Sequence, residues 1–154
     1  MLTPLAQLLQ SAIETELPHL QGITETVAEE KSGSKWSRKE ELGHLIDSAS
    51  NNHLRFVRAA LEREFHGPSY DQNGSVVLHG YQEQSWADLL EFWRRYNQLL
   101  VAVVARIPEG KLQTFCTIGS NAPVTLHFLI ADYVRHMQHH LDHILRREAV
   151  TQYP

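Results

Sequence analysis

The chain has 154 residues, of which 42% are hydrophobic and 21% charged, and its formal net charge is −4. This length favours a single domain over residues 1–154 with a sizeable core. The acidic balance argues against a nucleic-acid partner, which needs a basic stripe. One cysteine, Cys116, excludes an internal disulfide framework and fits a reducing cytoplasm. The sequence shows neither a signal peptide nor the roughly 20 apolar residues of a membrane span, so we expect a cytoplasmic protein without a membrane partner.

The first two helical segments are predicted from apolar residues at spacings of three and four. One covers about residues 3–30, and Pro18 should kink or split it. The next begins at Ser37, which forms a capping box with Glu40, and should end near Phe65.

A connector over residues 66–83 follows, rich in turn residues, in which residues 76–78 are expected to be extended. Loops of this length often lie over a functional opening, so we expect it to border a pocket. The third helix starts at Ser85 and ends before Pro108, and residues 111–118 should include a short extended piece.

The fourth helix is expected over about residues 124–148. Four long segments with one-sided apolar stripes are typical of an all-α four-helix bundle. The loops on either side of the third helix are too long for tight hairpins, so they allow a crossover. The predicted fold is therefore a four-helix bundle with long connecting loops.

Histidine is concentrated on the fourth helix, where five of the chain's ten histidines fall between His127 and His143. At about 100° per residue, His136, His140 and His143 share one helix face, with Asp132 one turn before His136. Two histidines at i and i+4 lie side by side and can chelate one metal ion. The pair His136 and His140 therefore needs a third ligand from elsewhere.

The best third ligand is His44 on the second helix. Ser48 and Arg55 follow it at helical spacing and make a polar strip beside the apolar stripe, as in the wall of a pocket. Three imidazoles and a water form an open site suited to zinc, nickel or a related divalent ion. Arg55, if it faces the pocket, can bind a carboxylate of a substrate or thiol.

The remaining polar residues near this site are expected to support it. A metal-bound imidazole needs a partner for its second nitrogen, and Asp132, Asp47 or a backbone carbonyl can supply one. His143 lies two turns from His136, so we expect it to support the ligands or line the pocket. Lone helical histidines such as His53 are more often surface or core residues than ligands.

Two other metal schemes fit less well. A zincin needs His-Glu-x-x-His, but Met137 follows His136. A di-iron carboxylate bundle needs two Glu-x-x-His motifs, and only Glu41 with His44 provides one. A mononuclear site is therefore preferred.

Two stretches together resemble the DinB/YfiT-like superfamily: residues 36–48, with Glu-Leu-Gly-His at 41–44, and residues 136–144, which begin His-Met-Gln-His-His. The resemblance implies a four-helix bundle that binds one divalent ion through a histidine of the second helix and a His-x-x-x-His of the last. These positions map onto His44, His136 and His140. It also implies S-transferases or isomerases that use a low-molecular-weight thiol, or metal-dependent hydrolases.

The resemblance further implies a homodimer. Leu54 and Leu61 lie off the main apolar stripe of the second helix and are candidates for its interface.

Three functions remain open from the sequence. The preferred one is a metal-dependent enzyme for a small-molecule substrate, a thiol-dependent S-transferase or a hydrolase, in which the metal activates water or a thiol. The second is a non-catalytic metal-binding or stress-related module. The third is a helical protein whose histidines bind nothing.

Overall fold

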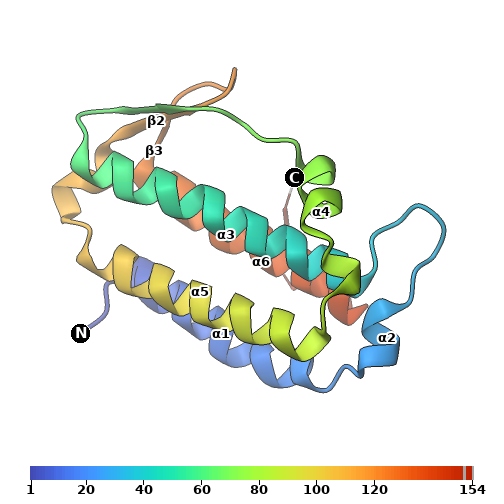
Figure 1. The fold of residues 1–154 in the computed structure, drawn as a ribbon. Helices are drawn as coiled ribbons and strands as arrows, with labels where there is room; N and C mark the ends of the chain where they lie inside the picture. Colours follow the sequence, from blue (N-terminus) through green and yellow to red (C-terminus); the bar gives the residue numbers. More distant parts are fainter. Residues whose placement is uncertain (151, 154) are drawn as a thin grey trace.

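The computed structural model describes residues 1–150, 152 and 153, and its body consists of four long helices (Figure 1). They are α1 (Pro4–Gln21), α3 (Arg38–Leu61), α5 (Trp86–Arg106) and α6 (Leu126–Leu145). Helices α1 and α3 each pack against both α5 and α6, so α1 and α3 lie diagonally opposite each other. The predicted all-α four-helix bundle is confirmed, with its second and fourth long helices in contact.

The order of the helices around the bundle differs from a simple up-and-down arrangement. Residues 22–37 lead from α1 to the diagonally placed α3, and residues 107–125 lead from α5 to the diagonally placed α6. The long connector between α3 and α5 joins neighbours instead. In an up-and-down bundle the second and fourth helices are diagonal, so these two crossovers are what bring α3 beside α6.

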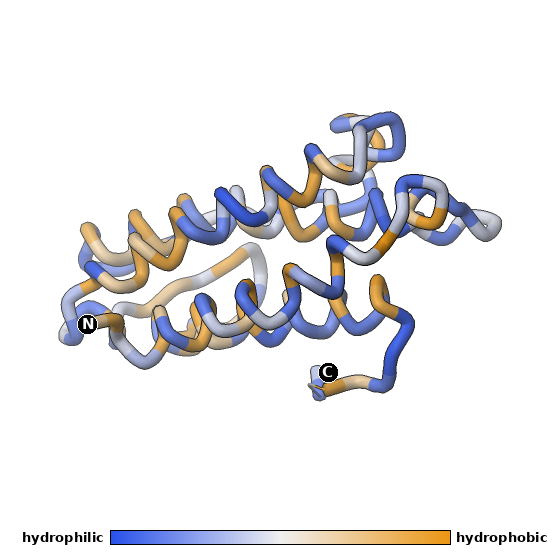
Figure 2. Tube along the Cα trace, turned by 90° about the horizontal axis from the view of Figure 1, so that it is seen from below, coloured by the Kyte–Doolittle hydropathy of each residue, from blue (hydrophilic) through white to orange (hydrophobic). Residues whose placement is uncertain are grey.

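Side-chain caps fix the helix starts as the sequence predicts. Ser37 Oγ accepts a hydrogen bond from Glu40 N, and Glu40 Oε1 accepts one from Ser37 N, each at 3.1 Å. At the starts of α5 and α6, the Ser85 and Thr125 side chains each accept one hydrogen bond, from Asp88 N and Phe128 N. Apolar and polar stretches alternate along each helix (Figure 2), and the apolar faces bury the core around Trp93.

The first segment divides later than predicted. Pro18 lies in the last turn of α1, which continues to Gln21, and α2 (Glu25–Glu29) begins after the cap Thr24. Trp86 Nε1 donates to the carbonyl of Leu20 at 3.1 Å. The same carbonyl accepts from Ile23 N at 3.1 Å, so a tight turn and the Trp86 side chain together hold the end of α1.

The prediction of an extended stretch at residues 76–78 is wrong. These residues belong to α4 (Gln72–His79), which Asp71 caps at its start and Gly80 ends with a left-handed φ of 61°. Val76 is buried and its two apolar neighbours are exposed. An apolar triplet does not by itself distinguish a strand from a short helix. A 3₁₀ turn, η1 (Tyr81–Glu83), completes the connector.

A small sheet closes one end of the bundle. Its strands are β1 (Phe65–Gly67), β2 (Phe115–Ile118) and β3 (Val124–Thr125), with β1 parallel and β3 antiparallel to β2. The short extended piece predicted within residues 111–118 is confirmed as β2. The start of that range belongs to the 3₁₀ turn η2 (Glu109–Gln113).

This sheet also explains two misplaced helix ends. Helix α3 stops at Leu61, before Phe65, because the chain must straighten into β1. Helix α6 starts two residues late because β3 precedes it, and it ends at Leu145, where Arg146 adopts a left-handed φ of 49°. Among the described helices, none has the length and apolarity required to cross a bilayer.

Gly43 is a point of close packing on α3. A Cβ added there would lie 2.1 Å from Cδ2 of Tyr81. The Tyr81 hydroxyl in turn donates to Asp47 Oδ1 at 2.6 Å, inside the protein. The missing side chain of Gly43 therefore lets the connector sit directly on α3.

We expect Gly43→Ala to lower the free energy of unfolding by about 1–3 kcal/mol, the usual cost of overpacking, despite the better helix propensity of alanine. Urea denaturation measures this difference. Gly110→Ala is the matched control, because a Cβ at Gly110 meets nothing within 4 Å. Equal stability of the two variants would show that Tyr81 moves aside freely.

Candidate metal centre

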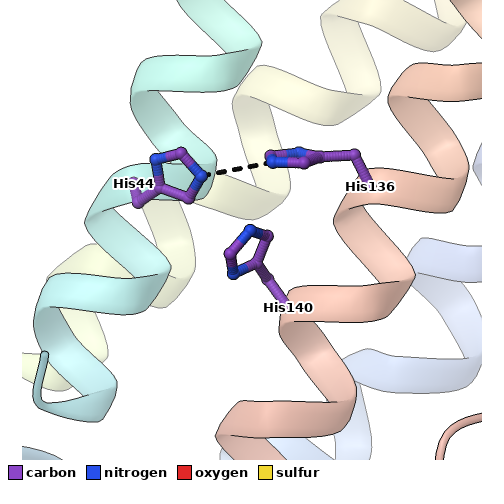
Figure 3. Close-up of side chains that lie close together, drawn as sticks. All are labelled: His44, His136 and His140. Atoms are coloured by element: carbon purple, nitrogen blue, oxygen red, sulfur yellow. Dashed lines mark hydrogen bonds between the residues drawn. The ribbon is translucent and has the colours of Figure 1, made fainter. Parts of the chain in front are cut away.

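Three histidines converge between α3 and α6 (Figure 3). His44 Nε2 and His136 Nε2 lie 3.3 Å apart, and the ring of His140 lies 4.6 Å from that of His44 and 4.5 Å from that of His136, between centroids. One candidate ligand atom from each residue lies within 4.8 Å of the other two. The structure thus brings together the three residues that the sequence predicts as ligands.

The local sequence explains this convergence. His136 and His140 are one turn apart on α6, so their rings stack along one helix face. The packing of α3 against α6 supplies His44. Arg38 is the first residue of α3, and its Nε donates to the carbonyl of Ile144, near the C-terminal end of α6, at 2.9 Å. This antiparallel register sets His44 opposite the histidine pair.

One pair of nitrogens already has the spacing of ligands to a tetrahedral divalent ion. Nitrogens that are each about 2.0–2.1 Å from one tetrahedral zinc lie about 3.3–3.4 Å from one another, which matches the 3.3 Å between His44 and His136. Burial lowers the pKa of His44 to about 4 and that of His136 to about 3. Both imidazoles are therefore neutral near pH 7 and hold the lone pairs that a metal requires.

Glu41 is a further residue of the candidate centre, and the sequence had not predicted it there. Its Oε1 lies 2.9 Å from His140 Nδ1 and 3.1 Å from His143 Nδ1. A carboxylate accepts from these nitrogens, so it holds the proton of His140 on Nδ1 and leaves Nε2 for an ion. The motif Glu41-x-x-His44 was the available signal, because it places both residues on neighbouring faces of α3.

The supporting residues proposed from sequence have different partners. Asp132 Oδ2 accepts from the Tyr153 hydroxyl at 3.2 Å, and its other oxygen is 3.4 Å from Arg135. Asp47 bonds Tyr81, and neither aspartate forms a hydrogen bond to a ligand histidine among the described residues. Nδ1 of His44 is buried and has no hydrogen-bond partner among the described residues.

His143 lies beside the centre without joining the three rings. It is exposed and shares the Glu41 carboxylate with His140. The resulting closeness of Glu41, His140 and His143 makes a second group with metal-ligand geometry. The two hydrogen bonds from the histidines already account for that arrangement.

A cavity of about 290 Å³ adjoins the centre. His136 lines it together with Arg55 and Asp132, so both predicted pocket residues reach the same space as a ligand histidine. Ser69 and Tyr70 of the connector form another wall, as predicted for the segment between α3 and α5. The greater mobility expected of this connector stays a prediction.

Comparison with known protein families identifies the fold. The model of the DinB superfamily matches residues 8–144. This chain belongs to the DinB superfamily. A search of curated proteins gave no significant match.

Solved structures with this DinB fold include YfiT from Bacillus subtilis, described as a probable metal-dependent hydrolase with an unusual four-helix bundle topology. It is 18% identical, with a TM-score of 0.82 over 92% of this chain and 82% of YfiT. The crossovers of α1 to α3 and α5 to α6 are a departure from simple up-and-down topology in the present chain.

The mycothiol-dependent maleylpyruvate isomerase also resembles this chain, with 12% identity and a TM-score of 0.71. The structure of a mutant of that isomerase gives 14% and 0.74. Both alignments cover 97% of this chain but 63% of the isomerase. At such identities, these likenesses establish the shared fold.

In this DinB protein, Glu41→Ala is expected to weaken metal binding by about 10–100-fold, the usual effect of losing the partner of a ligand histidine. Competition with a chromophoric chelator measures the affinity. Glu41→Gln keeps a hydrogen-bond acceptor and should fall between the alanine variant and the wild type. Glu14→Ala, on the exposed face of α1, is the control. An unchanged affinity in Glu41→Ala would show that His140 needs no support from this carboxylate.

Proposed function

We propose that this chain is a metal-dependent enzyme in which His44, His136 and His140 hold one divalent ion, zinc, nickel or a similar metal, beside a pocket for a small-molecule substrate. The observation that carries the proposal is the convergence of the three imidazoles at the wall of a cavity. Three protein ligands are typical of catalytic sites, which keep a further position for water or substrate, whereas structural sites are closed by four.

A divalent ion bound there would lower the pKa of a bound water or thiol and so supply a nucleophile near neutral pH. The chain's own contribution is to hold one nitrogen of each of the three histidines close to the other two. Glu41 orients His140 through Nδ1, and the ring of Trp36 packs against that of His44 with centroids 4.9 Å apart. Burial keeps His44 and His136 neutral and limits access of bulk water to their rings.

Two reaction classes fit this site: thiol-dependent S-transfer, with a low-molecular-weight thiol as cosubstrate, and hydrolysis of a small molecule. The description of YfiT as a probable metal-dependent hydrolase supports the second, and that of the isomerase as mycothiol-dependent supports the first. The cavity beside His136 favours either enzyme over a non-catalytic metal-binding or stress-related module, because such a module needs no substrate space.

A homodimer is part of the same proposal. Leu54 is 59% exposed and Leu61 is 79% exposed, on the outer side of α3. Phe92 and Leu99 are exposed on the neighbouring helix α5. Exposed apolar side chains on adjacent helices are what a helical interface between two copies would bury.

We expect His140→Ala to lose stoichiometric metal, because two remaining imidazoles bind a divalent ion much more weakly than three. Protein purified without a histidine tag and loaded with zinc or nickel is analysed by mass spectrometry for bound metal. His53→Ala should keep full metal content, since His53 contacts Tyr96 instead of the centre. His127→Ala, exposed on the same helix as His140, should also keep it.

Full metal content in His140→Ala would contradict the proposed ligand set. Absence of metal from the wild-type protein after loading would favour the third function open from the sequence, a helical protein whose histidines bind nothing. The reaction class is then tested by incubating the metal-loaded protein with a panel of small thiols and an electrophilic acceptor. Metal-dependent consumption of thiol indicates S-transfer, and metal-dependent cleavage without thiol indicates hydrolysis.

A further inference from the structure

The cavity beside the metal centre extends along α3. Ser48 lies one turn beyond His44, and Asn52 and Arg55 continue the same side of the helix, all three lining the space that His136 closes at its other side. Because α3 and α6 run antiparallel, a molecule bound in this cavity can touch both His136 and Arg55. Its volume of about 290 Å³ is at the low end of ligand pockets and suits a small molecule.

Arg55 differs in its partners from Arg147, another partly buried arginine. Arg147 lies between Glu16 and Asp142, at 2.9 Å and 2.8 Å from their oxygens. The guanidinium of Arg55 donates from Nη2 to the Pro68 carbonyl at 3.1 Å. No carboxylate of residues 1–150, 152 and 153 forms an ion pair with it.

An unpaired guanidinium at a cavity wall favours a bound anion. Burial lowers the pKa of Arg55, but a guanidinium remains charged at neutral pH. Removing a charge from water without a counter-ion costs free energy, which an anionic ligand offsets. The fork of N–H donors matches the two oxygens of a carboxylate, so such a ligand gains two parallel hydrogen bonds.

Two hydroxyl donors share the cavity with Arg55. Tyr70 lines the same cavity, and burial raises its pKa to about 12, so its hydroxyl stays protonated and able to donate. Ser48 offers a further hydroxyl. These neutral donors suit an oxygen-rich anion.

Asp132 is the opposing feature, because a carboxylate in the same cavity repels anions. It lies on α6, where Arg135 and the Tyr153 hydroxyl contact its two oxygens. Its charge is therefore partly compensated, while that of Arg55 is not. This asymmetry directs an anion to the α3 side of the cavity.

We propose that Arg55 anchors a carboxylate of the small molecule that the cavity holds, which makes the substrate or thiol cosubstrate a carboxylic acid. This inference rests on the proposed function for the role of the cavity, but the charge that binds the carboxylate comes from Arg55 and does not require the metal. The carboxylate would then lie at the end of the bound molecule that is remote from His44 and His140.

The test measures binding of succinate to the metal-loaded protein by calorimetry, with the neutral diamide of succinate and inorganic phosphate as comparison probes. Arg55→Gln should weaken succinate binding by about tenfold or more, as expected for a charge-assisted pair. Arg55→Lys, which keeps the charge but not the fork, should fall between the two. Arg58→Gln is the matched control, because Arg58 is exposed on the same helix and pairs with Glu62.

Equal succinate affinity in Arg55→Gln and wild type would overturn the inference, as would tighter binding of the diamide or of phosphate than of succinate. Metal content of Arg55→Gln should equal that of the wild type. Succinate binding that depends on Arg55 but persists in His140→Ala supports the anion site independently of the metal. If metal binds and succinate ignores Arg55, the inference fails while the proposed metal enzyme stands.

Discussion

The contact between α3 and α6 is the constraint on which the rest of the site depends. His44 and His136 are 92 residues apart in the chain, yet their Nε2 atoms lie 3.3 Å apart. Helix α6 supplies two of the three converging rings, and α3 supplies the third. The two diagonal crossovers make the contact possible, because an up-and-down order would separate these helices by the width of the bundle. The crossover topology is therefore required for the candidate metal centre.

The same helix pair imposes a cost that the centre must offset. His44 is 1% exposed, and its Nδ1 lacks a partner among the described residues. An unsatisfied buried nitrogen costs about 1–3 kcal/mol. A ligand bond at Nε2 would offset part of this cost, and Glu41 already supplies the partner that His140 needs.

Local patterns carried most of what the sequence could predict. The capping box of Ser37 and Glu40 and the i, i+4 pair of His136 and His140 depend on residues within two turns of one another. Four apolar stripes were enough for the bundle, and His44 followed from its polar strip.

Long-range partners were harder to predict. Glu41 is 99 residues from His140, and no spacing rule joins them. The crossover order and the parallel pairing of β1 with β2 likewise depend on packing between distant segments. The prediction for residues 76–78 failed for a local reason. The caps at Asp71 and Gly80 set their helix, and an apolar triplet is compatible with either a strand or a helix.

X-ray absorption spectroscopy of the zinc-loaded protein tests the central claim most directly, because it reports the atoms bound to the metal in solution. We expect a first shell that contains three imidazole nitrogens at about 2.0–2.1 Å and one further light atom. Multiple scattering characteristic of histidine should account for the outer peaks. A shell with sulfur, or with fewer than three imidazoles, would contradict a centre built from His44, His136 and His140.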